Sequence, residues 1–212
     1  KYKADFTHLD YVNPNAPQGG DIKHAELGSF DSVNPFALRG KAAQGLHLVH
    51  DRLMRRVWDE PFTLYPLIAQ RVDIPEDRSA ITVHINPDAK FNNGSSITSH
   101  DILYTYQTLM EHGRPNMRRI YKLITQANII DTYTIKFSFG EGYDQETAMI
   151  MAMMPVLSKS YWSDKDFDSA TLEAPVSSEG HRSYWPGIFA LPAGNAYESH
   201  QSDRSIRSVF LP

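Results

Sequence analysis

The chain contains no cysteine, which excludes disulfide bonds, cysteine-ligated zinc and a thiol nucleophile. It also lacks any run of about 18 apolar residues, so no segment of it is suited to span a membrane as a helix. Neither sign of charge dominates, because 21 basic and 25 acidic residues leave a net charge of -4 without long runs of one sign. Nucleic acid and anionic membrane surfaces attract strongly basic proteins, so the composition favours neither as a partner.

Other signals are missing as well. The first residues, KYKADFTHLDYVNP, lack the apolar region of a signal peptide, and we interpret them as the start of a processed protein. The sequence has no G-x-S-x-G elbow, no H-E-x-x-H pair, no Walker loop and no dinucleotide-binding glycine pattern. We therefore expect no enzyme and no cofactor, although scattered serine, histidine and aspartate residues leave a hydrolase triad open.

What is present fits an ordinary folded chain. The 212 residues are 41% hydrophobic, which is enough for one large domain or two small ones. Alternating apolar residues over 81–85 and 133–139 predict strands in two hairpins, and a strand is also expected over 21–30. Helical spacing predicts helices over 42–56, 116–123 and 144–154. The chain is thus expected to have an α+β fold, with hairpins and helices packed together within residues 60–160.

The most informative stretch covers residues 89–109. Asn93-Gly94 favours positive φ and predicts a tight turn after a strand. Thr98 and Asp101 have the spacing of a capping box, which satisfies backbone donors at the start of a helix. Apolar residues then recur at helical spacing until Gly113, which predicts that the helix ends there.

The sequence of this stretch, FNNGSSITSHDILYTYQTL, closely resembles a motif shared by the extracellular solute-binding proteins of the peptide/nickel class, the receptors of ABC importers. Two other segments, GGDIKHAELGSFDSVNPF and PVLSKSYW, are similar to phrases of the same family. The segment DEPFTLYPLIA looks like the branch that includes the periplasmic receptor of the Yej-type peptide importer, the microcin C receptor branch.

The resemblance implies the first lobe of a type II periplasmic binding protein. It covers residues 11–175 and then stops abruptly, so we expect the second lobe to be absent and the chain to be truncated. The expected organisation is an N-terminal arm with the first strand over 1–40, an α+β subdomain over 41–165, and a divergent, poorly ordered tail over 166–212.

The resemblance also implies a function and a site. A periplasmic receptor of this kind binds a peptide ligand and works with the membrane subunits of an ABC importer. A carboxylate in its cleft can hold an ammonium group, and an arginine can hold a carboxylate. The implied ligand-binding residues lie where the first strand ends and after the capped helix: Asp31, Asn34, Pro35, Phe36, Arg39, Arg118 and Tyr121.

Nine histidines keep a haem- or metal-binding receptor of the same fold open as an alternative. His47 and His50 would lie about one turn apart on the predicted 42–56 helix, but two imidazoles make an incomplete ligand set, which favours surface or packing roles. The methionines near residues 149–154 favour a role as buried filler over a binding face.

Overall fold

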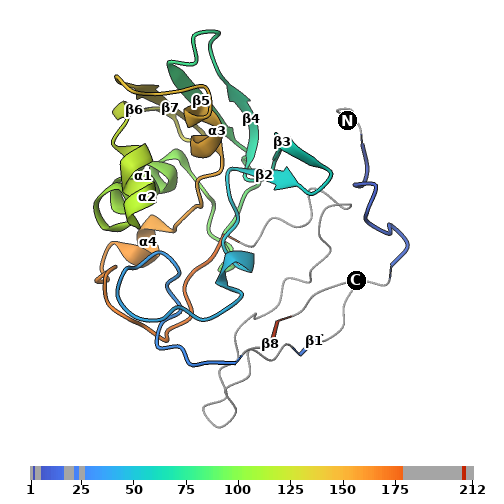
Figure 1. Cartoon of the computed structure of the whole chain (residues 1–212), viewed down its shortest axis with the longest axis vertical. Helices are drawn as coiled ribbons and strands as arrows, with labels where there is room; N and C mark the ends of the chain where they lie inside the picture. The colour runs from blue at the N-terminus through green and yellow to red at the C-terminus, as the bar shows by residue number, and fades with distance from the viewer. Residues whose placement is uncertain (1, 3–5, 17–21, 24–26, 179–206, 209–212) are drawn as a thin grey trace.

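The structure is a computed structural model that describes residues 2, 6–16, 22–23, 27–178 and 207–208 (Figure 1). Its strands are β1 (Ile22–Lys23), β2 (Met54–Val57), β3 (Glu60–Pro66), β4 (Ala69–Asp73), β5 (Ala80–Ile85), β6 (Ile124–Asp131), β7 (Thr134–Phe139) and β8 (Arg207–Ser208). Its helices are the 3-10 turn η1 (Leu46–Leu48), α1 (Ser99–His112), α2 (Pro115–Tyr121), α3 (Thr147–Ala152) and α4 (Lys159–Trp162).

An antiparallel sheet with the strand order β4-β5-β7-β6 forms the centre of the molecule. The predicted hairpins are confirmed as β4–β5 and β6–β7, and the central pair is in register with Ile81 opposite Phe137 and Val83 opposite Ile135. These side chains alternate with polar ones, so one face of the sheet is apolar and the other is polar. The α+β organisation of this region follows from that alternation.

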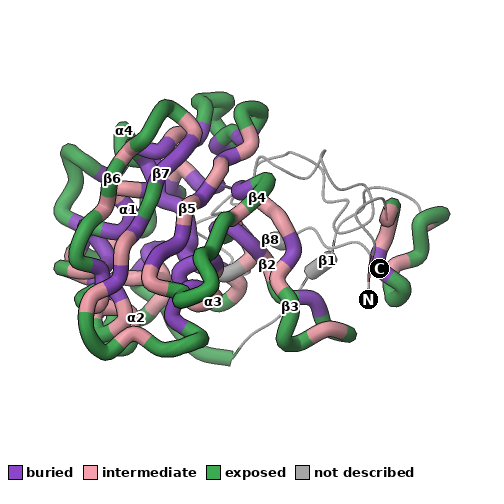
Figure 2. Tube along the Cα trace, turned by 90° about the horizontal axis from the view of Figure 1, so that it is seen from above, coloured by how far each residue is buried: buried purple, intermediate pink, exposed green. Residues whose placement is uncertain are grey.

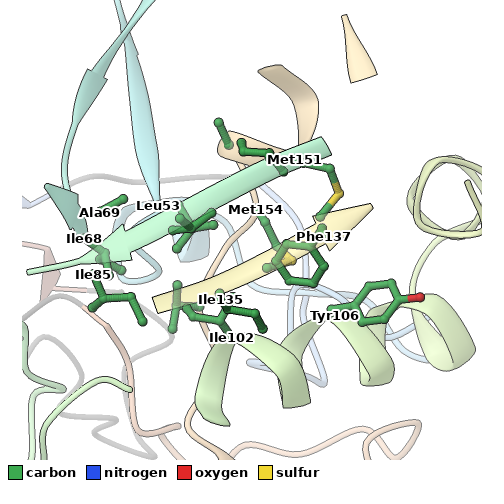
Figure 3. Packing of buried hydrophobic residues seen from close by; sticks show 14 of the residues in the cluster. Leu53, Ile68, Ala69, Ile85, Ile102, Tyr106, Ile135, Phe137, Met151 and Met154 are labelled. Atoms are coloured by element: carbon green, nitrogen blue, oxygen red, sulfur yellow. The ribbon is translucent and has the colours of Figure 1, made fainter. Parts of the chain in front are cut away.

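The main core lies between the apolar face of the sheet and the helices. Ile102 and Tyr106 of α1 point toward Ile135 and Phe137 of β7, and Met151 adds a further layer over Phe137 (Figure 3). Met151 and Met154 are both 1% exposed, which confirms the filler role predicted for this part of the chain. Figure 2 shows the buried positions concentrated on the inner strands, whereas the hairpin turns are exposed.

The start of α1 follows the local sequence closely. Gly94 has φ +84° and donates its N–H to the carbonyl of Phe91, so the predicted turn is present. Thr98 is the N-cap and forms a capping box with Asp101, whose Oδ2 accepts the Thr98 N–H at 3.0 Å. The other carboxylate oxygen of Asp101 accepts the Lys159 N–H at 3.0 Å, at the start of α4. One buried carboxylate therefore holds the first turns of two helices.

The helix predicted over 42–56 is wrong. This segment contains only η1 and then β2, which forms a hairpin with β3. The apolar residues at helical spacing are buried, except for the half-buried Ala42, but they enter three separate clusters: Val49 in one with Leu46, Leu53 in the main core, and Val57 with Tyr65. The apolar residues recur at helical spacing because three different parts of the chain cover them, and they do not form one face of a helix.

The first strand is shorter than predicted over 21–30. β1 covers Ile22–Lys23 and pairs with β8, while the described residues 27–30 are not in a strand and are exposed. The predicted boundaries of the arm, the subdomain and the tail stay predictions. Residues 179–206 and 209–212 of the expected tail lie outside the described residues.

The N-terminal arm packs on the β2–β3 hairpin and forms a small cluster of its own. Leu9 is fully buried, and the rings of Tyr2 and Phe6 lie 5.7 and 5.6 Å from the ring of Tyr65 on β3. The Tyr2 hydroxyl also contacts the Asp59 carboxylate. The arm is thus fixed mainly to the hairpin, away from the main core. In the described part of the chain, no helix is both long and apolar enough to cross a membrane.

Candidate ligand-binding site

The segment of residues 31–36, which carries most of the predicted ligand-binding residues, is held by hydrogen bonds from three sides. Ser32 is fully buried, its carbonyl accepts the Ala43 N–H at 2.8 Å, and its hydroxyl accepts the Asn34 N–H at 3.1 Å. Val33 donates its N–H to the Thr171 carbonyl at 2.7 Å. These contacts connect the segment to residues 166–173, which lie close to it in Figure 1.

Asn34 is 1% exposed and all its amide atoms have structural partners. Its Nδ2 donates to the Phe167 carbonyl at 2.9 Å, and its Oδ1 accepts the Phe36 N–H at 3.0 Å. Asn34 therefore shapes the loop and presents no polar atom to a ligand.

Pro35 and Phe36 connect the loop to two other parts of the chain. The Arg114 guanidinium, at the N-cap of α2, donates to the Pro35 carbonyl at 3.1 Å. The Phe36 ring meets the His50 ring edge-on, with the ring centroids 5.1 Å apart. His50 is 5% exposed, and neither ring nitrogen has a hydrogen-bond partner within the described residues. Burial lowers the pKa of His50 from 6.5 to about 4, so the ring is neutral at pH 7.

Asp31 and Arg39 lie at the exposed ends of this loop. An Asp31 oxygen accepts the Lys41 N–H at 2.5 Å, and the same oxygen lies close to Gly40, which has φ +82°. The Asp31 carboxylate is thus oriented by the backbone while its residue stays exposed. The positive charge of Arg39 helps to lower the pKa of Asp166, after the larger effect of the hydrogen bonds from Ser169 and Asp168.

The two predicted residues on α2 differ in their environment. Arg118 is half-buried, whereas Tyr121 is 3% exposed and its ring packs near Tyr106, with centroids 6.2 Å apart. Burial raises the pKa of Tyr121, and the nearby positive charge of Arg52 opposes that rise. Tyr121 is therefore part of the core, and Arg118 is the α2 residue of the predicted set that solvent reaches.

The structure thus brings Asn34, Pro35 and Phe36 together beside the start of α2. Of the charged residues of the predicted set, Asp31 and Arg39 are exposed and Arg118 is half-buried. Arg114 was not predicted, and no local pattern marks it, because its contact to Pro35 crosses 79 residues. His50 has the packing role that the sequence favoured. His47 lies in η1, so the two histidines do not share a helical face.

A separate shallow pocket of about 340 Å³ lies at the start of α1, and none of the seven predicted residues lines it. Its lining includes Ser95, Ser96, Ser160, His100 and Lys159. Within the described residues, no group of three or more histidine, aspartate or glutamate side chains is arranged to hold a metal ion.

Residues 63–180 match the family of bacterial extracellular solute-binding proteins, family 5, in its middle region. This match covers more than half of the chain. The chain belongs to this family.

Several curated proteins are similar to this chain. YejA of Escherichia coli (strain K12) is 36% identical over 182 residues, which cover 86% of this chain and 30% of YejA. The "Peptidoglycan-binding protein YepA" of Agrobacterium fabrum is 36% identical over 84% of this chain and 31% of its own length. The "Probable peptide-binding protein YejA" of the same organism is 31% identical over 85% of this chain and 30% of its own length. The chain thus spans about 30% of the length of these relatives.

Solved structures confirm the fold. The oligopeptide-binding protein AppA of Bacillus subtilis, in complex with a nonapeptide, has a TM-score of 0.56 at 14% identity over 73% of this chain and 31% of AppA. NikZ of Campylobacter jejuni, in complex with Ni(L-His), has a TM-score of 0.55 at 17% identity over 68% of this chain and 28% of NikZ. The mixed α/β fold is therefore that of part of a type II periplasmic binding protein, as the sequence predicted.

Proposed function

We propose that this family 5 protein is a periplasmic substrate-binding component of an ABC importer for oligopeptides or peptide-derived compounds. The observation that carries the proposal is the family match over residues 63–180. Membership of this family supports a role in binding a solute. That the solute is a peptide or a peptide-derived compound is the further part of the proposal.

The names of relatives support the class of ligand. One relative is named a probable peptide-binding protein and another a peptidoglycan-binding protein, and peptidoglycan fragments contain short peptides. Both kinds of ligand carry free ammonium or carboxylate groups. A site with exposed charges of both signs suits such ligands, because charge-assisted hydrogen bonds hold each end.

The geometry of the 31–39 loop suits this chemistry. The Asp31 carboxylate is oriented by the Lys41 N–H and can accept further hydrogen bonds from a ligand ammonium. Arg39 is exposed and Arg118 is half-buried, and a guanidinium group can hold a carboxylate through two parallel hydrogen bonds. In this proposal, Asn34, Pro35 and Phe36 position the loop, and Tyr121 supports α2 from the core.

The test is a titration of the 212-residue chain with tri- to nonapeptides, followed by amide NMR shifts. We expect weak binding with shifts at residues 31–39 and Arg118, because this length of chain supplies only part of the surface that encloses a ligand in a complete receptor. Asp31→Asn should weaken binding of peptides with a free N-terminus and leave N-acetylated peptides unaffected. Asp88→Asn, at an exposed carboxylate outside the site, is the matched control.

Two outcomes would contradict the proposal. If peptides bind without shifting any amide resonance of the 31–39 loop, the ligand does not bind at this loop. Binding of Ni²⁺ or haem in place of every peptide tested would favour the metal- or haem-receptor alternative.

A further inference from the structure

The central sheet ends on one side at β6, which is its longest strand and has no neighbour on its outer side within the described residues (Figure 1). Residues 124–130, ITQANII, contain no charged residue and no proline. An exposed strand of this kind presents a row of backbone donors and acceptors that another strand can pair with. Lysine, charge and proline are the usual protections of such an edge, and the middle of β6 has none of them.

The opposite edge of the same sheet differs. On β4, Arg71 donates to Asp73 at 3.1 Å, and Asp73 also contacts the His84 ring of β5 at 2.7 Å. This exposed charged network lies along the outer strand, and a second strand added there would have to accommodate it. The two edges of one sheet therefore offer an internal comparison.

The charges at the two ends of β6 point to its partner. Lys122 is exposed just before the strand, and Asp131 is exposed at its end. Hydrogen bonds from Tyr133 and Thr134 lower the pKa of Asp131, so its carboxylate is ionised at neutral pH. In an antiparallel pair of identical strands, the Lys122 end of one copy lies beside the Asp131 end of the other. A parallel pair would place like charges together, which is unfavourable.

We propose that the outer edge of β6 pairs antiparallel with β6 of a second copy of this chain, across a two-fold axis. The four strands of each copy then form one continuous sheet. The contact is isologous, because the same uncharged strand faces itself and the opposite charges at its ends meet. Residues 31–39 and Arg118 are not part of β6, although Lys122 is the C-cap of α2 and follows Arg118 by one turn.

The experiment is sedimentation velocity of the 212-residue chain over about a hundredfold range of protein concentration. The expected result is a shift from one chain to two as the concentration rises. Gln126→Lys places like charges near each other across the axis and should raise the dimer Kd at least about tenfold. Gln70→Lys, an exposed position on β4, should leave the dimer Kd unchanged. Far-UV circular dichroism checks that both variants are folded.

A second measurement uses uncharged substitutions, so that an introduced charge cannot disturb the folding of the chain. Because the chain has no cysteine, Gln126→Cys introduces a unique thiol on β6, and Gln70→Cys introduces one on β4. A short bismaleimide should cross-link two copies of Gln126→Cys and leave Gln70→Cys as single chains. A chain that sediments as a monomer at every concentration would overturn the proposal. So would equal effects of the two lysine variants, or equal cross-linking of the two cysteine variants.

Discussion

Burial of an imidazole ring without a hydrogen-bond partner is unfavourable for its charged form, and His50 is such a ring among the residues that the structure describes. Its pKa falls from 6.5 to about 4 because burial removes water from it. The unfolded chain therefore binds a proton below pH 6.5 that the folded chain does not bind until about pH 4. The stability of the fold should decrease as the pH falls through this window.

The first prediction follows from this sign. Between pH 7 and pH 5, His50 should lower the free energy of unfolding by about 2 kcal/mol, as measured by urea titration. His50→Phe should remove this decrease, whereas the exposed His100→Phe should keep it. Hydrogen bonds from His84 and Thr147 hold the pKa values of Asp73 and Asp144 below 3.8. These two carboxylates therefore change the free energy of unfolding only at a pH below this window. An unchanged pH dependence in His50→Phe would contradict the assignment.

The second prediction concerns the two carboxylate oxygens of Asp101. Thr98→Ala removes one side of the capping box and should cost about 1 kcal/mol. Asp101→Ala removes the hydrogen bonds to Thr98 and to Lys159 together, and should cost about 2–3 kcal/mol. Thermal unfolding measures both, with the exposed Asp88→Ala as control. Equal losses from the two variants would mean that the contact to α4 adds nothing.

At the scale of elements, local patterns predicted the segments whose partners are near in sequence. The Asn93-Gly94 turn and the start of α1 depend on residues a few positions apart, and the hairpins of β4–β5 and β6–β7 pair strands that follow one another directly in the sequence. The helix expected over 42–56 failed because its apolar residues are buried by different distant partners. A periodic pattern reports burial, and it identifies a helix only when one neighbour covers the whole face.

The third prediction compares two glycines in the same backbone conformation. Gly40 has φ +82° and Gly94 has φ +84°. A Cβ on Gly94 would meet nothing within 4 Å, so Gly94→Ala should cost about 1 kcal/mol from backbone strain alone. A Cβ on Gly40 would lie 2.7 Å from the Asp31 Oδ1, so Gly40→Ala should cost at least about 2 kcal/mol. Urea unfolding of both variants measures the difference, and equal costs would show that the Asp31 loop moves freely.

At the scale of the whole molecule, the described residues form a main core and two smaller clusters. The arm and the β2–β3 hairpin share one of the smaller clusters, which includes Leu9 and Val57. The main core holds Ile102, Phe137 and Met151. Met54 of β2 belongs to the main core, whereas the apolar arm residues Leu9, Tyr2 and Phe6 pack in the smaller cluster. Opening of the arm should therefore expose the Val57 and Tyr65 side of the hairpin without unfolding the main core.

The fourth prediction tests that separation by hydrogen exchange. Leu9→Ala should lower the protection of amides in the β2–β3 hairpin and leave those of β5 and β7 unchanged. Ile102→Ala leaves a cavity in the main core and should lower the global stability by about 2–5 kcal/mol. Both side chains are fully buried, so each variant is a control for the other. Loss of protection throughout the sheet in Leu9→Ala would show that the clusters unfold as one.

The sequence by itself determined the family, the fold class and the elements between residues 80 and 139, because caps, tight turns and alternation act over a few residues. Tertiary structure alone decided the roles of individual side chains. Asn34 bonds to Phe167 across 133 residues, and Tyr121 is closed into the core beside Tyr106, so neither offers a polar surface despite lying in the predicted set. Asp101 serves α4 across 58 residues, a link that no local pattern contains. The burial and the hydrogen-bond partners of a side chain depend on which distant segments come into contact, and those contacts exist only in the folded chain.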